Sequence, residues 1–208
     1  MHSSIAAALL LSVCGACSAL ADDDGECRGS SGDAAIVACT RAIVFDRPHS
    51  SDLVRAYHLR GRAFFARDEK FQALRDYNAA LWIDPGASDV YVDRGALFAD
   101  RGDLDLALTN YEVAIKTGGD GAEPYVGRGL AHYDRGDFVR ALADLETALE
   151  RSPDLAKAHR ARGLVLKEMG EKERALSDFL AAVRLDPKDV DAAAEAAALR
   201  KQGVKPAP

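Results

Sequence analysis

The chain has 208 residues, of which 48% are hydrophobic and 29% are charged. It carries 27 basic and 33 acidic side chains, which give a formal net charge of −6 at pH 7. The hydrophobic fraction is large enough to form a buried core, which excludes a disordered or collagen-like polymer. A net negative chain without a dominant Lys/Arg run lacks the clustered positive charge that phosphate binding requires, so we expect no nucleic-acid partner.

The first 21 residues contain no Asp, Glu, Lys or Arg, and residues 5–13 form an apolar stretch. This stretch is too short to span a bilayer, and the tripeptide at 19–21 fits the small-x-small pattern of a cleavage site. We therefore expect residues 1–21 to be a signal peptide that directs the chain to the periplasm or outside the cell. The alternative is a lipid anchor on Cys17, because a small residue before a cysteine resembles a bacterial lipoprotein box.

An acidic, Gly/Ser-rich arm at residues 22–32 would begin the mature chain. Two cysteines remain after cleavage, Cys27 and Cys39, an even number in an oxidising compartment. We expect them to form a disulfide that holds the arm on the first helix. Two buried free thiols are the alternative.

An Arg-Gly pair recurs at intervals of 34 residues, at Arg60-Gly61, Arg94-Gly95, Arg128-Gly129 and Arg162-Gly163. An alanine follows each glycine by twelve residues, and a large apolar residue follows that alanine by four. Within each unit, apolar residues recur at three- and four-residue steps in two runs split by a turn, which predicts a helical hairpin. The glycine and the alanine mark a close approach of the two helices, because larger side chains there would separate them.

This pattern resembles the tetratricopeptide repeat (TPR) family over residues 53–187. The resemblance implies an all-α fold, a right-handed α-solenoid of four helical hairpins. We expect repeats at about 54–87, 88–121, 122–155 and 156–187. Expected helices span 54–67, 70–83, 88–101, 104–117, 122–135, 138–151, 156–169 and 172–185.

The ends of such a stack need covers, because one hairpin cannot bury its own apolar face. Residues 33–45 resemble the second helix of a repeat, with Cys39 in the slot of the large apolar residue, and predict an N-terminal half-repeat. The Ala-rich segment 188–201 predicts a capping helix. The solenoid would thus cover residues 33–203, followed by a tail at 204–208.

The arginine of each Arg-Gly pair is expected to face a polar residue across its hairpin. These partners are Asp76, Asn110, Asp144 and Asp178. A guanidinium inside a hairpin needs its charge matched, and its fork suits a carboxylate. The alternative is a basic ladder that grips an anionic ligand.

In TPR proteins the first helix of each hairpin lines a concave groove. The resemblance implies the lining residues Arg55, His58, Arg62, Phe65, Asp89, Val92, Asp93, Asp100, Glu123, Val126, Leu130, Tyr133, Asp134, Lys157, Arg160, Leu164 and Lys167. We expect a groove that is basic at both ends and acidic in the middle, and that takes a mixed-charge or partly basic extended segment.

TPR domains that bind a C-terminal carboxylate use Asn and Lys/Arg at slots that here hold Asp93, Glu123 and Gly127. The two carboxylates would repel such a peptide. The sequence offers no motif for catalysis, a metal or a cofactor. We therefore expect a non-catalytic scaffold for a protein or peptide partner. The alternatives are a self-associating structural protein and an accessory subunit of an envelope enzyme complex.

Overall fold

The computed structural model describes residues 27, 29, 32–45, 50–118 and 121–207. The expected signal peptide, Cys17 and most of the acidic arm lie outside these residues. The chain divides into two compact units, the first ending at Val90 and the second beginning at Tyr91.

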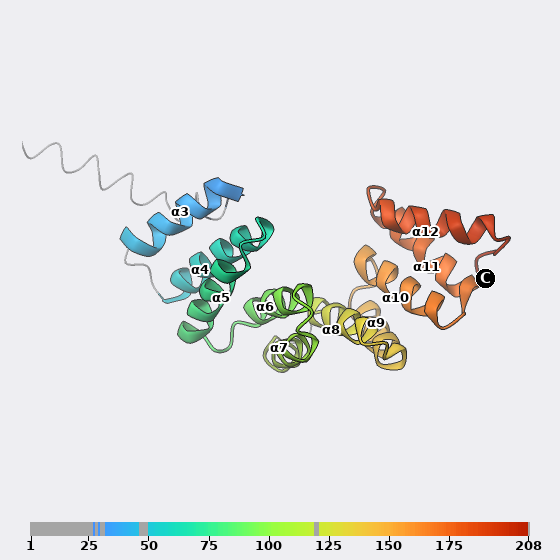
Figure 1. Cartoon of the computed structure of the whole chain (residues 1–208), viewed down its shortest axis with the longest axis horizontal. Helices are drawn as coiled ribbons and strands as arrows, with labels where there is room; N and C mark the ends of the chain where they lie inside the picture. Colours follow the sequence, from blue (N-terminus) through green and yellow to red (C-terminus); the bar gives the residue numbers. More distant parts are fainter. Residues whose placement is uncertain (1–26, 28, 30–31, 46–49, 119–120, 208) are drawn as a thin grey trace, which may run out of the picture. The chain divides into compact units, whose positions relative to one another are not determined.

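Among the described residues of the first unit, helix α3 is followed by one helical hairpin (Figure 1). Helix α3 (Gly32–Phe45) packs on α4 (Ser50–Ala66), and α4 pairs with α5 (Lys70–Ile83). Helix α3 has the place and the length expected of the N-terminal half-repeat. Helix α4 starts four residues earlier than the sequence pattern predicts, at Ser50 instead of residue 54.

The second unit repeats the helical hairpin. Helix α6 (Ser88–Asp100), which begins in the first unit, is followed by α7 (Leu104–Thr117), α8 (Glu123–Asp134), α9 (Phe138–Arg151), α10 (Ala156–Glu168), α11 (Lys172–Leu185) and α12 (Val190–Lys201). Helix α8 packs on α7, α9 and α10, and α11 packs on α10 and α12. Every regular element of the described residues is an α-helix.

The two helices of each hairpin meet where the marker glycine stands. A Cβ atom added at Gly163 would lie 2.8 Å from Cε1 of Phe179, and one at Gly129 would lie 2.9 Å from Cγ of Leu145. Tyr77 and Tyr111 contact the glycines of the first and second hairpins in the same way. The large apolar residue therefore fills the space that the missing side chain leaves, and this contact fixes the register of the two helices.

In the half-repeat, a pair of cysteines takes the place of the glycine contact. Cys39 occupies the slot of the large apolar residue and forms a disulfide with Cys27, with Sγ atoms 2.06 Å apart and Cα atoms 4.7 Å apart. Both cysteines are buried, beside Ala38 and Ala42 of α3 and Ala56 of α4.

The turn inside each hairpin requires a residue in the left-handed backbone region. Gly102, Gly136 and Gly170 take φ values of 79°, 77° and 85°, and Asp68 takes 61° at the same position of the first hairpin. Glycine adopts this conformation without the steric penalty of a Cβ atom. These turns place the second helix antiparallel to the first.

The last helix covers the apolar face of the last hairpin. Ala192, Ala196 and Leu199 of α12 are buried against Leu176 and Phe179 of α11. Asp189 caps the start of α12, where its carboxylate accepts a hydrogen bond from the Ala192 N–H at 3.0 Å. The sequence-based expectation of a capping helix at 188–201 thus corresponds to α12.

Replacing Gly163 with alanine tests the close approach. The new methyl group would collide with the buried ring of Phe179, an overpacking that costs about 1–3 kcal/mol. The better helix propensity of alanine offsets about 1 kcal/mol of this cost. We expect urea denaturation to show a net loss of roughly 1 kcal/mol in the free energy of unfolding.

Gly121→Ala is the matched control, because the nearest atom to its Cβ would be Cδ of Pro124, 3.9 Å away. Its effect on stability should stay within about 0.5 kcal/mol. Equal effects of the two substitutions would contradict the proposed role of Gly163.

Candidate functional site

The arginines of the Arg-Gly pairs are bound inside their own hairpins. Arg60 donates from Nε and Nη2 to the two carboxylate oxygens of Asp76, at 2.6 and 2.8 Å. Arg128 binds Asp144 with the same fork, at 2.9 and 2.7 Å. Such two-point contacts are the strongest that a guanidinium makes with a carboxylate.

The fourth hairpin has the same fork, and the second has a weaker version. Arg162 donates to both oxygens of Asp178 at 2.8 Å, whereas Arg94 donates from Nε to the single side-chain oxygen of Asn110 at 2.8 Å. The hydrogen bond to Asp178 raises the pKa of Arg162. Burial lowers the pKa of Arg94, whose partner Asn110 is neutral.

Aromatic rings complete three of these contacts. The guanidinium carbons of Arg60, Arg94 and Arg128 lie 5.4, 5.2 and 5.7 Å from the ring centres of Tyr57, Tyr91 and Tyr125. Cation–π attraction operates at such distances. In each hairpin a carboxylate or an amide holds the guanidinium, and in three hairpins an aromatic ring adds to this contact. The geometry therefore favours an architectural role for the arginines over a ladder for an anionic ligand.

In the first unit, the residues expected to line the groove lie on α4 and at the start of α6. Arg55, Arg62 and Asp89 are exposed, and His58 and Phe65 are half-buried. The His58 ring meets the Tyr77 ring edge-on, with centres 6.1 Å apart. His58 therefore packs against the core of its own hairpin.

In the second unit, the expected lining residues lie on α6, α8 and α10. We call this surface the first-helix face, and it comprises Asp93, Asp100, Glu123, Leu130, Tyr133, Asp134, Lys157, Arg160, Leu164 and Lys167. Because α8 and α10 are in contact, their parts of the face are neighbours. Val126 does not belong to it: this side chain is fully buried in the core between α8 and α9.

The C-terminal end of the first-helix face is less basic than expected from its own residues. Arg160 binds Asp189 and Asp191 at 3.2 Å each, and Lys167 binds Glu195 at 2.8 Å. These carboxylates belong to α12 and its cap, which the sequence analysis treated only as a cover. The capping helix and its cap thus neutralise two of the three cations that α10 contributes to the first-helix face, while Lys157 is exposed.

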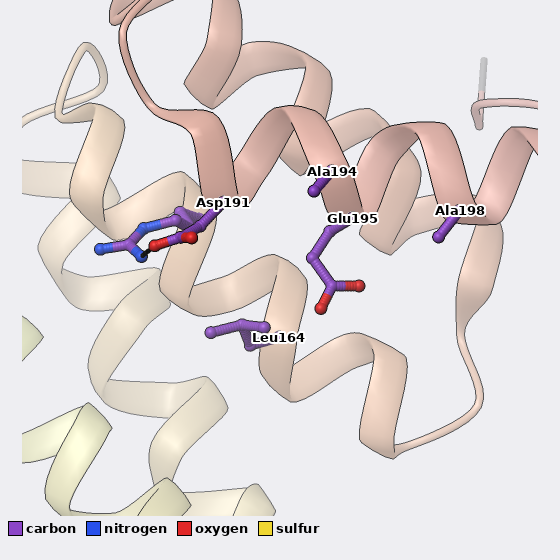
Figure 2. A pocket seen from close by; sticks show the side chains of 6 residues that line it. Leu164, Asp191, Ala194, Glu195 and Ala198 are labelled. Carbon is purple, nitrogen blue, oxygen red and sulfur yellow. Dashed lines mark hydrogen bonds and ion pairs between the residues drawn. The ribbon is translucent and has the colours of Figure 1, made fainter.

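A pocket of about 490 Å³ lies between α10 and α12 (Figure 2). Its lining residues are Arg160, Leu164, Asp191, Ala194, Glu195 and Ala198. Leu164 and the alanines give it an apolar floor, and the ion pair of Arg160 with Asp191 closes one end. Its volume falls in the range of sites that take a small ligand or several atoms of an extended segment.

Tyr111 of α7 packs against two first helices, α6 and α8, a contact that the sequence did not predict. Its ring lies between Gly95 of α6 and Gly127 of α8, and a Cβ at Gly127 would stand only 2.3 Å from Cε1. Burial raises the pKa of Tyr111, and the carboxylates of Asp93 and Asp134 raise it further. The sequence signal was Gly127 itself, a second glycine in a first helix that has only one in the other hairpins.

The described residues contain no helix long and apolar enough to cross a membrane. The same part of the chain contains no group of three or more His, Cys, Asp or Glu residues that could hold a metal ion.

A stack of 34-residue helical hairpins, with small residues at the crossing and a side-chain ladder within each pair, defines a class of helical-repeat proteins. Residues 126–190 match the family model described as "Tetratricopeptide repeat". The chain is thus similar to this family over its third and fourth hairpins, which contain most of the matched residues. No curated protein sequence matches it.

Solved structures with the same fold come from several TPR proteins. A thermophilic TPR protein of Thermus thermophilus is 21% identical, with a TM-score of 0.68 over 81% of this chain and 90% of that one. PilF of Pseudomonas aeruginosa is 23% identical, with a TM-score of 0.69 over 74% and 70%. YrrB is 23% identical, with a TM-score of 0.58 over 79% and 83%. These likenesses confirm the expected all-α solenoid class.

Removing one member of a buried ion pair tests the architectural role of the arginines. Asp144→Ala leaves the Arg128 guanidinium inside the hairpin without its counterion, which costs about 3 kcal/mol in comparable pairs. Asp144→Asn should cost less, because Asn110 serves as the partner of Arg94 in the second hairpin. Urea denaturation of both variants measures the difference. An unchanged stability of Asp144→Ala, together with loss of partner binding in Arg128→Ala, would instead support the ligand ladder.

The buried phenol of Tyr111 predicts a pH dependence of stability. The unfolded chain ionises this group near its ordinary pKa of 10.0, whereas the folded chain keeps it neutral to higher pH because burial raises the pKa. The folded state then binds more protons, so the free energy of unfolding falls as the pH rises above about 10. Tyr111→Phe lacks this contribution, and its stability should fall less steeply over the same pH range in urea denaturation. Identical slopes for the two proteins would contradict the burial of the phenol.

Proposed function

We propose that the chain is a non-catalytic scaffold that binds an extended segment of a protein partner on the first-helix face. The observation that carries this proposal is the pocket between α10 and α12, which continues the first-helix face at its C-terminal end. A half-apolar pocket with charged groups at its rim suits a side chain of a peptide in the extended conformation. YrrB is described as a TPR protein with an unusual peptide-binding site, which supports the same use of the fold here.

We further propose that the scaffold acts outside the cytoplasm, in the periplasm or after secretion. The charge-free N-terminal segment with its small-x-small tripeptide supports export. The disulfide between Cys27 and Cys39 supports an oxidising compartment, since such bonds persist there and are reduced in the cytosol. An anchor on Cys17 remains the alternative mode of localisation.

Self-association is a second candidate function, and one surface of the first unit favours it. Phe71 and Trp82 of α5 are 78% and 86% exposed. They lie eleven residues apart, which places them on the same face of the helix. Light scattering of the purified chain distinguishes a monomer from an assembly, and Trp82→Ser should dissociate an assembly that uses this surface.

Charge reversal on the first-helix face tests the scaffold. The tagged chain is crosslinked in cells and recovered from the exported fraction, and its crosslinked partners are identified by mass spectrometry. In the double variant Glu123→Lys/Asp134→Lys we expect the main partner to be lost. The control Glu150→Lys/Asp154→Lys reverses two exposed charges on α9 and the turn that follows it, and should retain the partner. Loss of the partner in both variants, or in neither, would exclude the first-helix face as the binding surface.

The same preparation reports the export step. The intact mass should fit a chain that begins at Asp22 and contains the Cys27–Cys39 disulfide. A mass that fits an acylated Cys17 start would replace the soluble exported form with an anchored one, and recovery of the full chain from the cytoplasm would contradict export.

A further inference from the structure

The hydroxyl end of Tyr111 lies beside α8, on the first-helix face of the second unit. A Cβ at Gly127 would lie 2.5 Å from Cζ, the atom that carries the hydroxyl, whereas one at Gly95 would lie 3.1 Å from it. The side chain is therefore closer to α8 at its polar end, although the residue as a whole is only 3% exposed. Within the described part of the chain, the hydroxyl of Tyr111 makes no hydrogen bond.

The carboxylates of Asp93 and Asp134 lie near this hydroxyl, on α6 and α8. Glu123, Gly127, Leu130 and Asp134 follow one another along a single face of α8, at steps of four, three and four residues. Asp93 of α6 adds a further negative charge near the hydroxyl, as its effect on the pKa of Tyr111 indicates. Glu123 and Asp134 are exposed, and neither forms an ion pair or a side-chain hydrogen bond with another described residue.

Two arginines of the same hairpins have partners on the second helices. Arg94 is bound to Asn110 of α7, and Arg128 is bound to Asp144 of α9. Partial burial raises the pKa of Asp134, because loss of hydration destabilises the charged carboxylate. A cation close to the carboxylate would stabilise this charge. At the other end of the face, Arg160 and Lys167 are paired with carboxylates of α12.

The groups at this place can accept hydrogen bonds and repel anions. A carboxylate only accepts, and a phenol oxygen accepts as well as donates. The complementary group is a cation with several N–H donors, such as the ammonium of lysine or the guanidinium of arginine.

We propose that the hydroxyl of Tyr111 and the carboxylate of Asp134, with Asp93 and Glu123 beside them, bind a lysine or arginine side chain of the partner segment. This inference rests on the proposed function, because it specifies the chemistry of the segment that the first-helix face would take. It places a basic residue at one position of the mixed-charge or partly basic segment expected from the sequence.

Two conservative variants test the site. Tyr111→Phe removes only the hydroxyl, and Phe179 already occupies the equivalent slot against Gly163 in the fourth hairpin, so the variant should fold. Asp134→Asn removes one charge from an exposed position. Asp154→Asn, in the turn after α9, removes the same charge away from the face and is the matched control.

The probe is a set of fluorescein-labelled peptides with one Ala/Ser/Leu background and Lys, Arg, norleucine or Glu at each position in turn. Fluorescence polarisation with residues 22–208 gives the dissociation constants. We expect Lys and Arg at one position to bind about tenfold more tightly than norleucine, with Glu the weakest. Tyr111→Phe and Asp134→Asn should each reduce this preference by several-fold and leave the norleucine peptides unchanged, while Asp154→Asn has no effect.

The outcomes separate the two proposals. Binding of peptides without a preference for Lys or Arg, or a preference that survives both variants, would overturn the cation site and leave the peptide scaffold standing. A preference that Asp154→Asn also reduces would show general charge attraction and would overturn the site. Absence of binding by every peptide of the set would contradict both proposals.

Discussion

The close approach of two helices at a glycine is the constraint on which the rest of the structure depends. In each full hairpin the glycine faces a large apolar residue sixteen positions later. This contact sets the register of the two helices. The arginine that precedes the glycine therefore lies opposite the polar residue that precedes the large apolar residue. The pairs of Arg128 with Asp144 and Arg162 with Asp178 follow directly from that register. One packing contact therefore positions both the apolar core and the polar interior of the hairpin.

The same packing separates two populations of carboxylates. Asp76, Asp144 and Asp178 are buried and bound by arginine within their hairpins, so their charges contribute to architecture. Glu123 and Asp134 are exposed on α8. Helix α12 adds further carboxylates that bind Arg160 and Lys167. The first-helix face of the second unit is therefore more acidic than its own residues suggest, and the basic segment that we propose complements this charge.

The ends of a helical repeat are exposed to water unless something covers them, and this chain uses a different device in each unit. In the first unit, Cys39 replaces the large apolar residue and meets Cys27 instead of a glycine. In the second, α12 buries Ala192, Ala196 and Leu199 on the last hairpin. Both covers consist mainly of small side chains.

The sequence by itself determined the repeat, the hairpins and the partners of the arginines. The period of 34 residues, the small residues and the polar residue sixteen positions after each arginine are all local in the chain, and helical geometry converts such spacings directly into contacts. The second helices of the four hairpins, α5, α7, α9 and α11, begin and end at the residues that this pattern predicts.

Only the tertiary structure decided the charge and the shape of the candidate site. The insertion of Tyr111 beside Gly127, a contact between different hairpins, depends on how α7 packs against α8. The neutralisation of Arg160 and Lys167 likewise depends on where α12 lies. Each of these contacts joins a hairpin to the helix that follows it. Packing between the two sets the distance, and the repeat pattern within a hairpin does not encode it.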